Sequence, residues 1–408
     1  MNDKNRRLRI LLVGIAVMFV IGIIYAWSIL KAPLQVEFQW SASCLALNFT
    51  LMMCMFCIGG IISGAALSRI SVKIILIMAG ILAWVGFYNA SKINEKGIIT
   101  LYLTYGILAG LGIGIGYNAV ISIVNEWFTD KKGTSSGALM MSFGASALFF
   151  GNAADWLIRY IGWRSTYRML GSCCGLVLLL AAVVMKHPES IEETTGYQQL
   201  ENVKNTRQDR QRLNYTPKEM LKCPEFYRFF IFLILACAVG NSTISMSRDV
   251  ALSVGASTGL ASILAGAISL CNGCGRIASG IMFDRYGRKR TMLIDSIITI
   301  IAPIIMLIAV KEKSVILCGI GLCATGLSYS FQPPVTSSVV ASFFGMKCFS
   351  INYSITNLMM IPASCVATIV GVLYTKTASF SVSFMVLILC AVLSAILNIG
   401  IKNPQNKI

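Results

Sequence analysis

The sequence has few charged residues and almost no histidine. Only 12% of its 408 residues are Asp, Glu, Lys or Arg, whereas 56% are hydrophobic and the mean hydropathy is +0.74. That leaves too little polar surface for a water-soluble domain. A single histidine and no G-x-x-x-x-G-K-[ST] loop argue against a histidine proton relay and a nucleotide-driven pump. The chain is therefore expected in a bilayer.

Acidic residues are scarce within the apolar segments. An intramembrane enzyme needs paired titratable groups, and an exporter of cationic drugs needs buried acids. Neither pattern is present in the spans given below, so both classes are disfavoured. The net charge of +17 is spread over short clusters between apolar runs, whereas a nucleic-acid binder gathers its Lys and Arg on one face. We expect no nucleic-acid partner.

Most of the 14 cysteines lie inside apolar segments, where a thiol behaves as a small hydrophobic group. The pair Cys271-x-x-Cys274 has metal-ligand spacing, but a zinc site needs further ligands and His187 lies in a polar stretch. We therefore expect packing roles for these thiols, with no metal and no cofactor.

Twelve segments are long and apolar enough to cross a membrane, since about 20 helical residues span the hydrocarbon core. They predict an all-α membrane protein of twelve transmembrane helices in two pseudo-symmetric six-helix bundles. The bundles are expected at residues 1–185 and 229–408, with a cytoplasmic linker loop at 186–228. The spans are 10–30, 44–67, 74–91, 98–124, 134–154, 169–185, 229–247, 257–283, 291–310, 315–335, 349–374 and 379–401.

Basic residues indicate the orientation. Lys and Arg are more numerous on the side that holds both termini, even without the long central loop. Basic residues in short loops are retained in the cytoplasm, so both termini are expected to be cytoplasmic. The run at 10–30 lacks a clear cleavage site and is expected to remain as a helix in the plasma or inner membrane. We expect a multi-pass protein that works as a monomer in the lipid bilayer.

An internal repeat relates the two halves. GAALSRISVK at 64–73 follows the second span, and GIMFDRYGRK at 280–289 follows the eighth. The same offset relates Gly110 to Gly326 and Trp127-Phe128 to Phe343-Phe344. A shared register over separate landmarks indicates a duplicated unit.

The second copy resembles the G-x-x-x-D-R-x-G-R-K loop of the major facilitator superfamily at every fixed position. The first copy departs from it, with Ser68 in the Asp position and Ser71 in the second Gly position. The resemblance implies a gating loop, stronger in the C-terminal half. Its residues would be Gly64, Arg69, Gly280, Asp284, Arg285, Gly287 and Arg288.

A narrower resemblance extends through both halves. The motifs are YAWS at 25–28, FQWS at 38–41, Gly116-Tyr117, EWFTDKKG at 126–133, Asn272-Gly273 with Arg276, and Asn352-Tyr353. In this order they are similar to the oxalate:formate antiporter family. The resemblance implies a carrier of small carboxylates.

Arg276 is the candidate anchor for that carboxylate. It lies seven residues, about 10 Å along a helix, inside the expected end of its span at Phe283. An intramembrane charge costs several kcal/mol unless it faces water or a partner, and apart from the ninth span, which holds Asp295, no other span carries an acid to neutralise it. The acid in the ninth span, Asp295, is expected to reach the interface near Arg290. An anionic substrate would supply the missing partner, because a guanidinium fork pairs with a carboxylate.

Helical spacing gathers further polar and aromatic residues around this position. Residues three or four apart share a helix face, and tyrosines can supply rigid walls and phenolic donors. For each tyrosine, interfacial anchoring or helix packing is an equal alternative, and a helix carbonyl is the alternative partner for Arg276. The candidate substrate-binding residues are Arg276, Asn272, Tyr25, Tyr117, Tyr329, Gln332, Tyr353, Asn357 and Met360.

The family comparison suggests the substrate's charge. Oxalate carriers have a lysine on the eleventh span, and that position is Met360 here. A single fixed positive charge favours a monocarboxylate such as formate, pyruvate or lactate over oxalate. Monocarboxylate porters carry an acid where this chain has Asn272, so anion exchange or uniport is expected. The alternatives are a proton-coupled carboxylate symporter and a transporter-like carboxylate sensor.

Overall fold

The computed structural model describes residues 3–94, 97–188, 214–377 and 379–404. Over these residues, ten helices are long and apolar enough to cross a membrane. Two of them, α7 (Lys132–Val184) and α11 (Thr258–Lys311), have twice the required length. Each is interrupted by a glycine at positive φ, Gly162 (76°) in α7 and Gly287 (74°) in α11. The described residues therefore include twelve spans, which confirms the predicted fold class.

The chain forms two compact units. Unit 1 comprises Met1–Thr129, Ser142–Tyr215 and Phe344–Ile355, and unit 2 comprises Asp130–Met141, Thr216–Phe343 and Thr356–Ile408. The predicted boundaries of the bundles and the linker remain predictions, and residues 189–213 of the expected linker lie outside the described residues.

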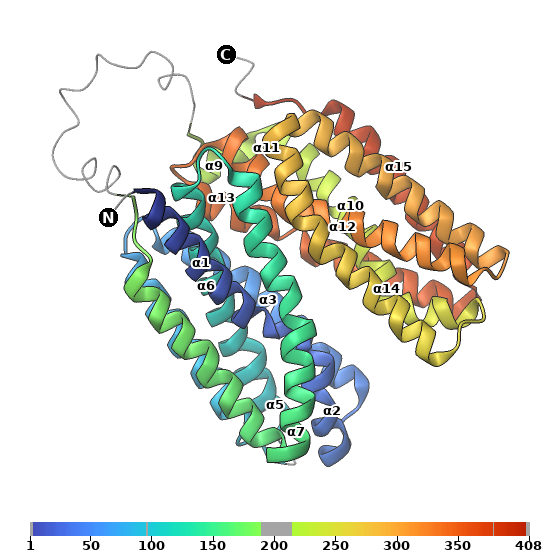
Figure 1. Cartoon of the computed structure of the whole chain (residues 1–408), viewed down its shortest axis with the longest axis horizontal. Helices are drawn as coiled ribbons and strands as arrows, with labels where there is room; N and C mark the ends of the chain where they lie inside the picture. Colours follow the sequence, from blue (N-terminus) through green and yellow to red (C-terminus); the bar gives the residue numbers. More distant parts are fainter. Residues whose placement is uncertain (1–2, 95–96, 189–213, 378, 405–408) are drawn as a thin grey trace. The chain divides into compact units, whose positions relative to one another are not determined.

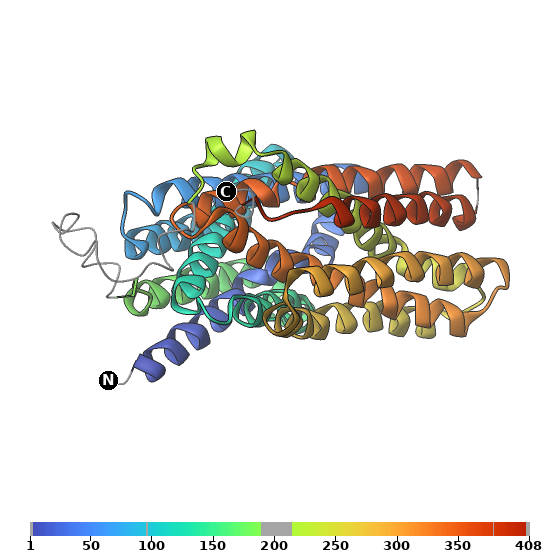
Figure 2. The same ribbon diagram turned by 90° about the horizontal axis from the view of Figure 1, so that it is seen from above.

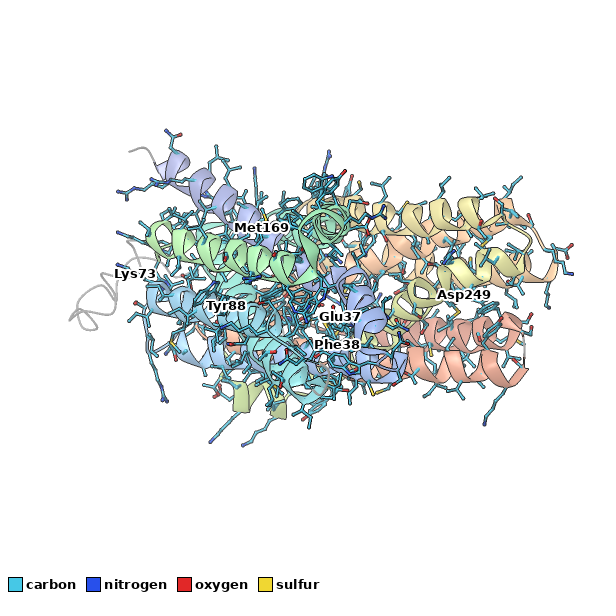
Figure 3. The ribbon with its side chains drawn as sticks, turned by 90° about the horizontal axis from the view of Figure 1, so that it is seen from below. Glu37, Phe38, Lys73, Tyr88, Met169 and Asp249 are labelled. Carbon is cyan, nitrogen blue, oxygen red and sulfur yellow. The ribbon has the colours of Figure 1, made fainter. Side chains whose placement is uncertain are left out.

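Unit 1 is organised around α6, which is the most buried of its helices. Helices α1 and α3 pack against α6 (Figure 1). Helix α4 also packs against α6, and α3 contacts η2 as well. Figure 3 labels Lys73 at one end of this unit, away from Glu37 and Phe38 at the end of α2. The elements begun in unit 1 are α1 (Asp3–Ile21), η1 (Gly22–Ala26), α2 (Trp27–Phe38), α3 (Ala42–Ala66), α4 (Val72–Ala90), α5 (Ile98–Leu101), η2 (Tyr102–Ala109), α6 (Gly110–Trp127) and α13 (Phe349–Asn357).

Unit 2 contains the later helices and the start of α7. Helix α10 packs against α11, α14 and α15, and α14 lies beside α15 (Figure 2). Buried aliphatic and aromatic side chains from these helices form one continuous core. The remaining elements are α9 (Pro217–Lys222), α10 (Pro224–Ser253), α12 (Val315–Phe344), α14 (Met360–Thr377) and α15 (Phe380–Gly400).

The eleventh span lies at Phe349–Tyr374, as predicted, but the helix within this span is broken. Helix α13 ends at Asn357 and α14 begins at Met360. Pro362 has no N–H to give to the carbonyl of Leu358, and Ile361 N donates to that oxygen instead at 3.1 Å. Non-helical backbone inside a membrane protein is tolerated where it is buried in protein or lines an aqueous cavity. The break therefore marks a candidate functional position.

Candidate functional site

Arg276 lies on α11 in unit 2, where α11 passes unusually close to the start of α7. A Cβ atom added to Gly133 would come within 2.3 Å of Gly280 O, and one added to Gly137 within 2.4 Å of Arg276 O. Only glycine allows this approach at both points. The sequence Gly133-x-x-x-Gly137 thus holds the backbone of Arg276 directly against α7.

The guanidinium of Arg276 is only partly satisfied. Its side chain is 6% exposed, and one terminal nitrogen donates to the carbonyl of Met140, one turn beyond Gly137. The Nε atom is buried with no hydrogen-bond partner. No acidic side chain of the described residues forms an ion pair with Arg276. A helix carbonyl, the alternative partner that the sequence allowed for Arg276, is thus present. It accepts from only one of the five N–H donors of the guanidinium.

The other candidate residues on α11 and α12 differ in their contacts. Asn272, one turn earlier, is half-buried and its Oδ1 is buried without a hydrogen-bond partner. Tyr329 is half-buried, with its ring against Gly240 of α10. Gln332 is buried and donates through Nε2 to Asp295 at 2.8 Å.

Asp295 does not approach the interface as the sequence suggested. It is 1% exposed, and its carboxylate accepts from Gln332 Nε2 and from Thr299 Oγ1 at 3.2 Å. No Lys or Arg of the described residues pairs with it. Because Thr299 lies one turn after Asp295 on the same face, neutral donors replace the expected contact with the membrane surface.

Asn357 and Met360 lie on either side of the break between α13 and α14. Both side chains are half-buried. The adjacent Met359 is buried, and its sulfur accepts from the Cys237 thiol at 3.8 Å. Met359 therefore packs into unit 2, while the turn leaves Met360 more accessible.

Unit 1 brings the three remaining candidate tyrosines together. The hydroxyls of Tyr117 and Tyr353 are 3.3 Å apart. The ring centroid of Phe143 lies 4.9 Å from that of Tyr117 and 5.3 Å from that of Tyr25. Phe56 packs on Tyr117 at 5.0 Å. Sequence reasoning missed Phe143 and Phe56, because a phenylalanine in an apolar run carries no spacing signal of its own.

The expected gating-loop residues lie at helix ends and crossings. In unit 1, Gly64 packs on the backbone of Ile351, and Arg69 is exposed. In unit 2, Arg285 lies over the ring of Tyr286, with 5.6 Å from Cζ to the centroid, and Arg288 donates to Ile401 O at 3.0 Å.

Asp284 makes the most specific contact of this loop. Its carboxylate accepts from Gly133 N at 2.9 Å, Thr134 N at 2.7 Å and Thr134 Oγ1 at 2.7 Å. These are the orphan donors of the first turn of α7, where a negative charge is also favourable. Ser68, which replaces the acid in the first copy, donates instead to Ala65 O within its own helix end. A gating role for the loop remains a prediction.

Asp284→Asn is expected to lower the stability of the protein. The amide keeps the size of the side chain but removes its charge and points a donor at the N–H groups of α7. We expect a loss of about 1 kcal/mol, which for a chain of 408 residues corresponds to a melting temperature lower by about 1 °C. Thermal unfolding in detergent measures this, with Asp249→Asn, an exposed acid on α10, as the matched control. Equal melting temperatures for the two variants would remove the capping role.

The described residues contain twelve membrane spans, a duplicated loop and a buried arginine with no acidic ion-pair partner among them. Together these features indicate a polytopic carrier. The sequence model of the Major Facilitator Superfamily matches residues 10–247, and that of "Sugar (and other) transporter" matches residues 195–402. The chain belongs to the Major Facilitator Superfamily. It is accordingly a membrane-embedded, multi-pass transporter of a small molecule, and not an enzyme.

Individual relatives are distant but cover most of the chain. An "Uncharacterized MFS-type transporter YhjX" of Escherichia coli is 26% identical over 88% of this chain and 85% of its own length. The "Oxalate:formate antiporter" of Oxalobacter formigenes is 22% identical over 84% and 79%. "Monocarboxylate transporter 12" of Mus musculus is 23% identical over 91% and 80%.

The fold likeness extends to solved structures. The proton:xylose symporter XylE superposes with a TM-score of 0.79 at 14% identity, covering 97% of this chain and 95% of its own. At that identity the likeness concerns the fold alone.

Proposed function

We propose that this protein moves a small organic monocarboxylate, such as formate, pyruvate or lactate, by alternating access, through anion exchange or uniport. Oxalate is the less favoured substrate. In this proposal the protein lies in a plasma or inner membrane, with both termini on the cytoplasmic side. It works as a monomer and has no nucleic-acid partner.

The observation that carries the proposal is the state of Arg276. A buried guanidinium with one carbonyl partner and an unpartnered Nε is costly in a membrane protein. A carboxylate of the substrate would satisfy both the charge and the remaining donors, because two parallel N–H···O bonds fit the guanidinium fork. Asn272, one turn away and half-buried, is the proposed second contact, because its Nδ2 amide group can donate to a carboxylate oxygen.

The tyrosine cluster of unit 1 supports the proposal that the substrate is a small, flat anion. Tyr117 and Tyr353 present two adjacent hydroxyls backed by Phe143 and Phe56. Phenolic hydroxyls donate to carboxylate oxygens while their rings exclude water. We propose that Tyr25, Tyr117 and Tyr353 contact the substrate during the transport cycle.

The preference for one negative charge rests on Met360. Through the resemblance to oxalate carriers, this position would hold a second cation for a dianion. Here it holds a neutral thioether, half-buried at the helix break. The names of two relatives, an oxalate:formate antiporter and a monocarboxylate transporter, support the carboxylate class.

A proton-coupled symporter is the second candidate, and Asp295 favours it. This carboxyl is fully buried among neutral donors, which is the environment in which an acid exchanges a proton during a cycle. If protons are coupled, Asp295→Asn should abolish accumulation against a gradient while leaving exchange intact.

Counterflow in proteoliposomes tests the proposal. Vesicles preloaded with unlabelled formate or pyruvate should take up the labelled acid transiently, without an imposed proton gradient. A sensor would bind the acid without any flux, and an obligate symporter would need a proton gradient for net uptake. Binding without counterflow for every C1–C4 carboxylate would overturn the transport proposal.

A further inference from the structure

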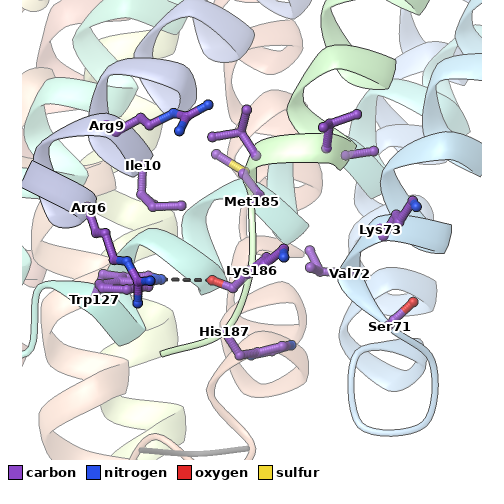
Figure 4. A pocket seen from close by; sticks show the side chains of 13 residues that line it. Arg6, Arg9, Ile10, Ser71, Val72, Lys73, Trp127, Met185, Lys186 and His187 are labelled. Atoms are coloured by element: carbon purple, nitrogen blue, oxygen red, sulfur yellow. Dashed lines mark hydrogen bonds between the residues drawn. The ribbon is translucent and has the colours of Figure 1, made fainter. Parts of the chain in front are cut away.

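A cavity of about 750 Å³ opens at the end of unit 1 that carries the N-terminal residues. It lies between the start of α1, the start of α4, the end of α6 and the segment that follows α7 (Figure 4). Trp127 Nε1 donates to Lys186 O at 2.8 Å and fixes that segment across the cavity. The volume falls within the range of small-ligand sites, about 300–1,000 Å³.

The lining of this cavity is strongly basic. Arg6 and Arg9 come from α1, Lys73 from α4, and Lys186 and His187 from the segment after α7. No acidic residue is among the lining residues. Glu126 lies outside the lining and is bonded to His187 Nδ1 at 2.7 Å. Within the described residues, Arg9, Lys73 and Lys186 form no ion pair, so the cavity concentrates unneutralised positive charge.

The beginning of α4 adds backbone donors to this charge. Ser71 is the N-cap of α4 and lines the cavity, and its side chain makes no capping hydrogen bond. The N–H groups of the first helical turn and the positive end of the helix dipole are therefore available to an oxyanion. Arginines, lysines and helix N–H groups together are the donor set that recognises phosphate.

Apolar side chains beside the cavity favour a lipid as the source of that phosphate. Val183, on its wall, is 68% exposed. Leu8 and Leu12 of α1 and Ile74 of α4 are also exposed next to the lining residues. A lipid whose phosphate lies in the cavity can therefore place its acyl chains along the exposed apolar side chains of these helices. Basic pockets between transmembrane helices bind anionic headgroups in this way.

We propose that this basic cavity binds the phosphate group of an acidic phospholipid. The site is independent of the carboxylate site, since it uses neither Arg276 nor the tyrosine cluster. Arg9, Lys73 and Lys186 provide the charge that selects the headgroup, and Ser71 with the start of α4 orients its oxygens.

Native mass spectrometry and thermal unfolding of the full-length protein test this site. In an uncharged detergent, phosphatidylglycerol should bind at least about tenfold more tightly than phosphatidylcholine and raise the melting temperature. The triple variant Arg9→Gln, Lys73→Gln, Lys186→Gln should bind both lipids equally. The matched control Lys311→Gln, Lys313→Gln, Lys376→Gln removes the same charge from exposed positions at the ends of α11 and α14 and in the turn after α11, and it should keep the preference.

Two results would overturn the proposal. One is a cavity variant that binds phosphatidylglycerol as the wild type does, and the other is a control variant that loses the preference equally. Inorganic phosphate distinguishes the two sources of the ligand. If millimolar phosphate displaces phosphatidylglycerol and alone gives the same thermal shift, the oxyanion site stands and its occupant comes from solution. Wild-type selectivity between the two lipids tests the proposal even if the triple variant does not fold.

Discussion

Arg276→Gln is expected to reduce uptake of the transported carboxylate by about 100-fold or more. The amide keeps a polar but uncharged side chain on α11. It cannot form two charge-assisted hydrogen bonds with a carboxylate, and losing such a buried contact costs about 3 kcal/mol or more. Initial uptake and substrate affinity in proteoliposomes measure the effect.

Two further variants separate binding from folding. Arg276→Lys retains the charge without the planar fork, so it should recover part of the activity. Arg248→Gln removes an exposed arginine from α10 and should transport as the wild type does. Unchanged uptake and affinity in Arg276→Gln would exclude this residue as the anchor.

Met360→Lys is expected to shift selectivity toward a dianion. A lysine at the break between α13 and α14 would give unit 2 a second cation, and both charges would be balanced only by a substrate with two carboxylates. We expect the ratio of oxalate to formate transport to rise about tenfold, which corresponds to about 1.4 kcal/mol. Competition of each acid against labelled formate measures this ratio.

Met360→Gln is the matched control for that shift, because it is similar in length and polar but uncharged. It should leave the ratio near that of the wild type. If the lysine and glutamine variants gave the same ratio, the argument from charge at this position would fail.

Most of the fold could be predicted from the sequence, because hydrophobic length and charge are sufficient to define membrane spans. The repeat at 64–73 and 280–289 also identified Gly64 and Gly280, and each of these glycines lies in close contact with the backbone of another helix or turn. The break after Asn357 was missed, although Pro362 in the sequence removes the N–H needed to continue the helix. The apolar composition of 349–374 predicts one uninterrupted helix, and a single proline did not change that prediction.

The site could be predicted only in part. Arg276 stood out because a charge within an apolar run has few structural explanations. The Gly133-x-x-x-Gly137 approach that fixes its backbone involves α7, far away in the sequence, and helical spacing within one span cannot reveal it. For Asp295, the spacing to Thr299 offered a neutral partner, but the contact with Gln332 depends on how two helices pack.

Ligand-induced thermal stabilisation of the purified protein tests the central claim most directly. Formate, pyruvate and lactate would be compared with the corresponding neutral amides, each with the wild type and Arg276→Gln. A ligand that binds the folded state raises its melting temperature. The account predicts stabilisation by at least one acid, none by its amide, and no effect in the variant. Equal stabilisation by acid and amide, or full stabilisation of Arg276→Gln, would contradict it.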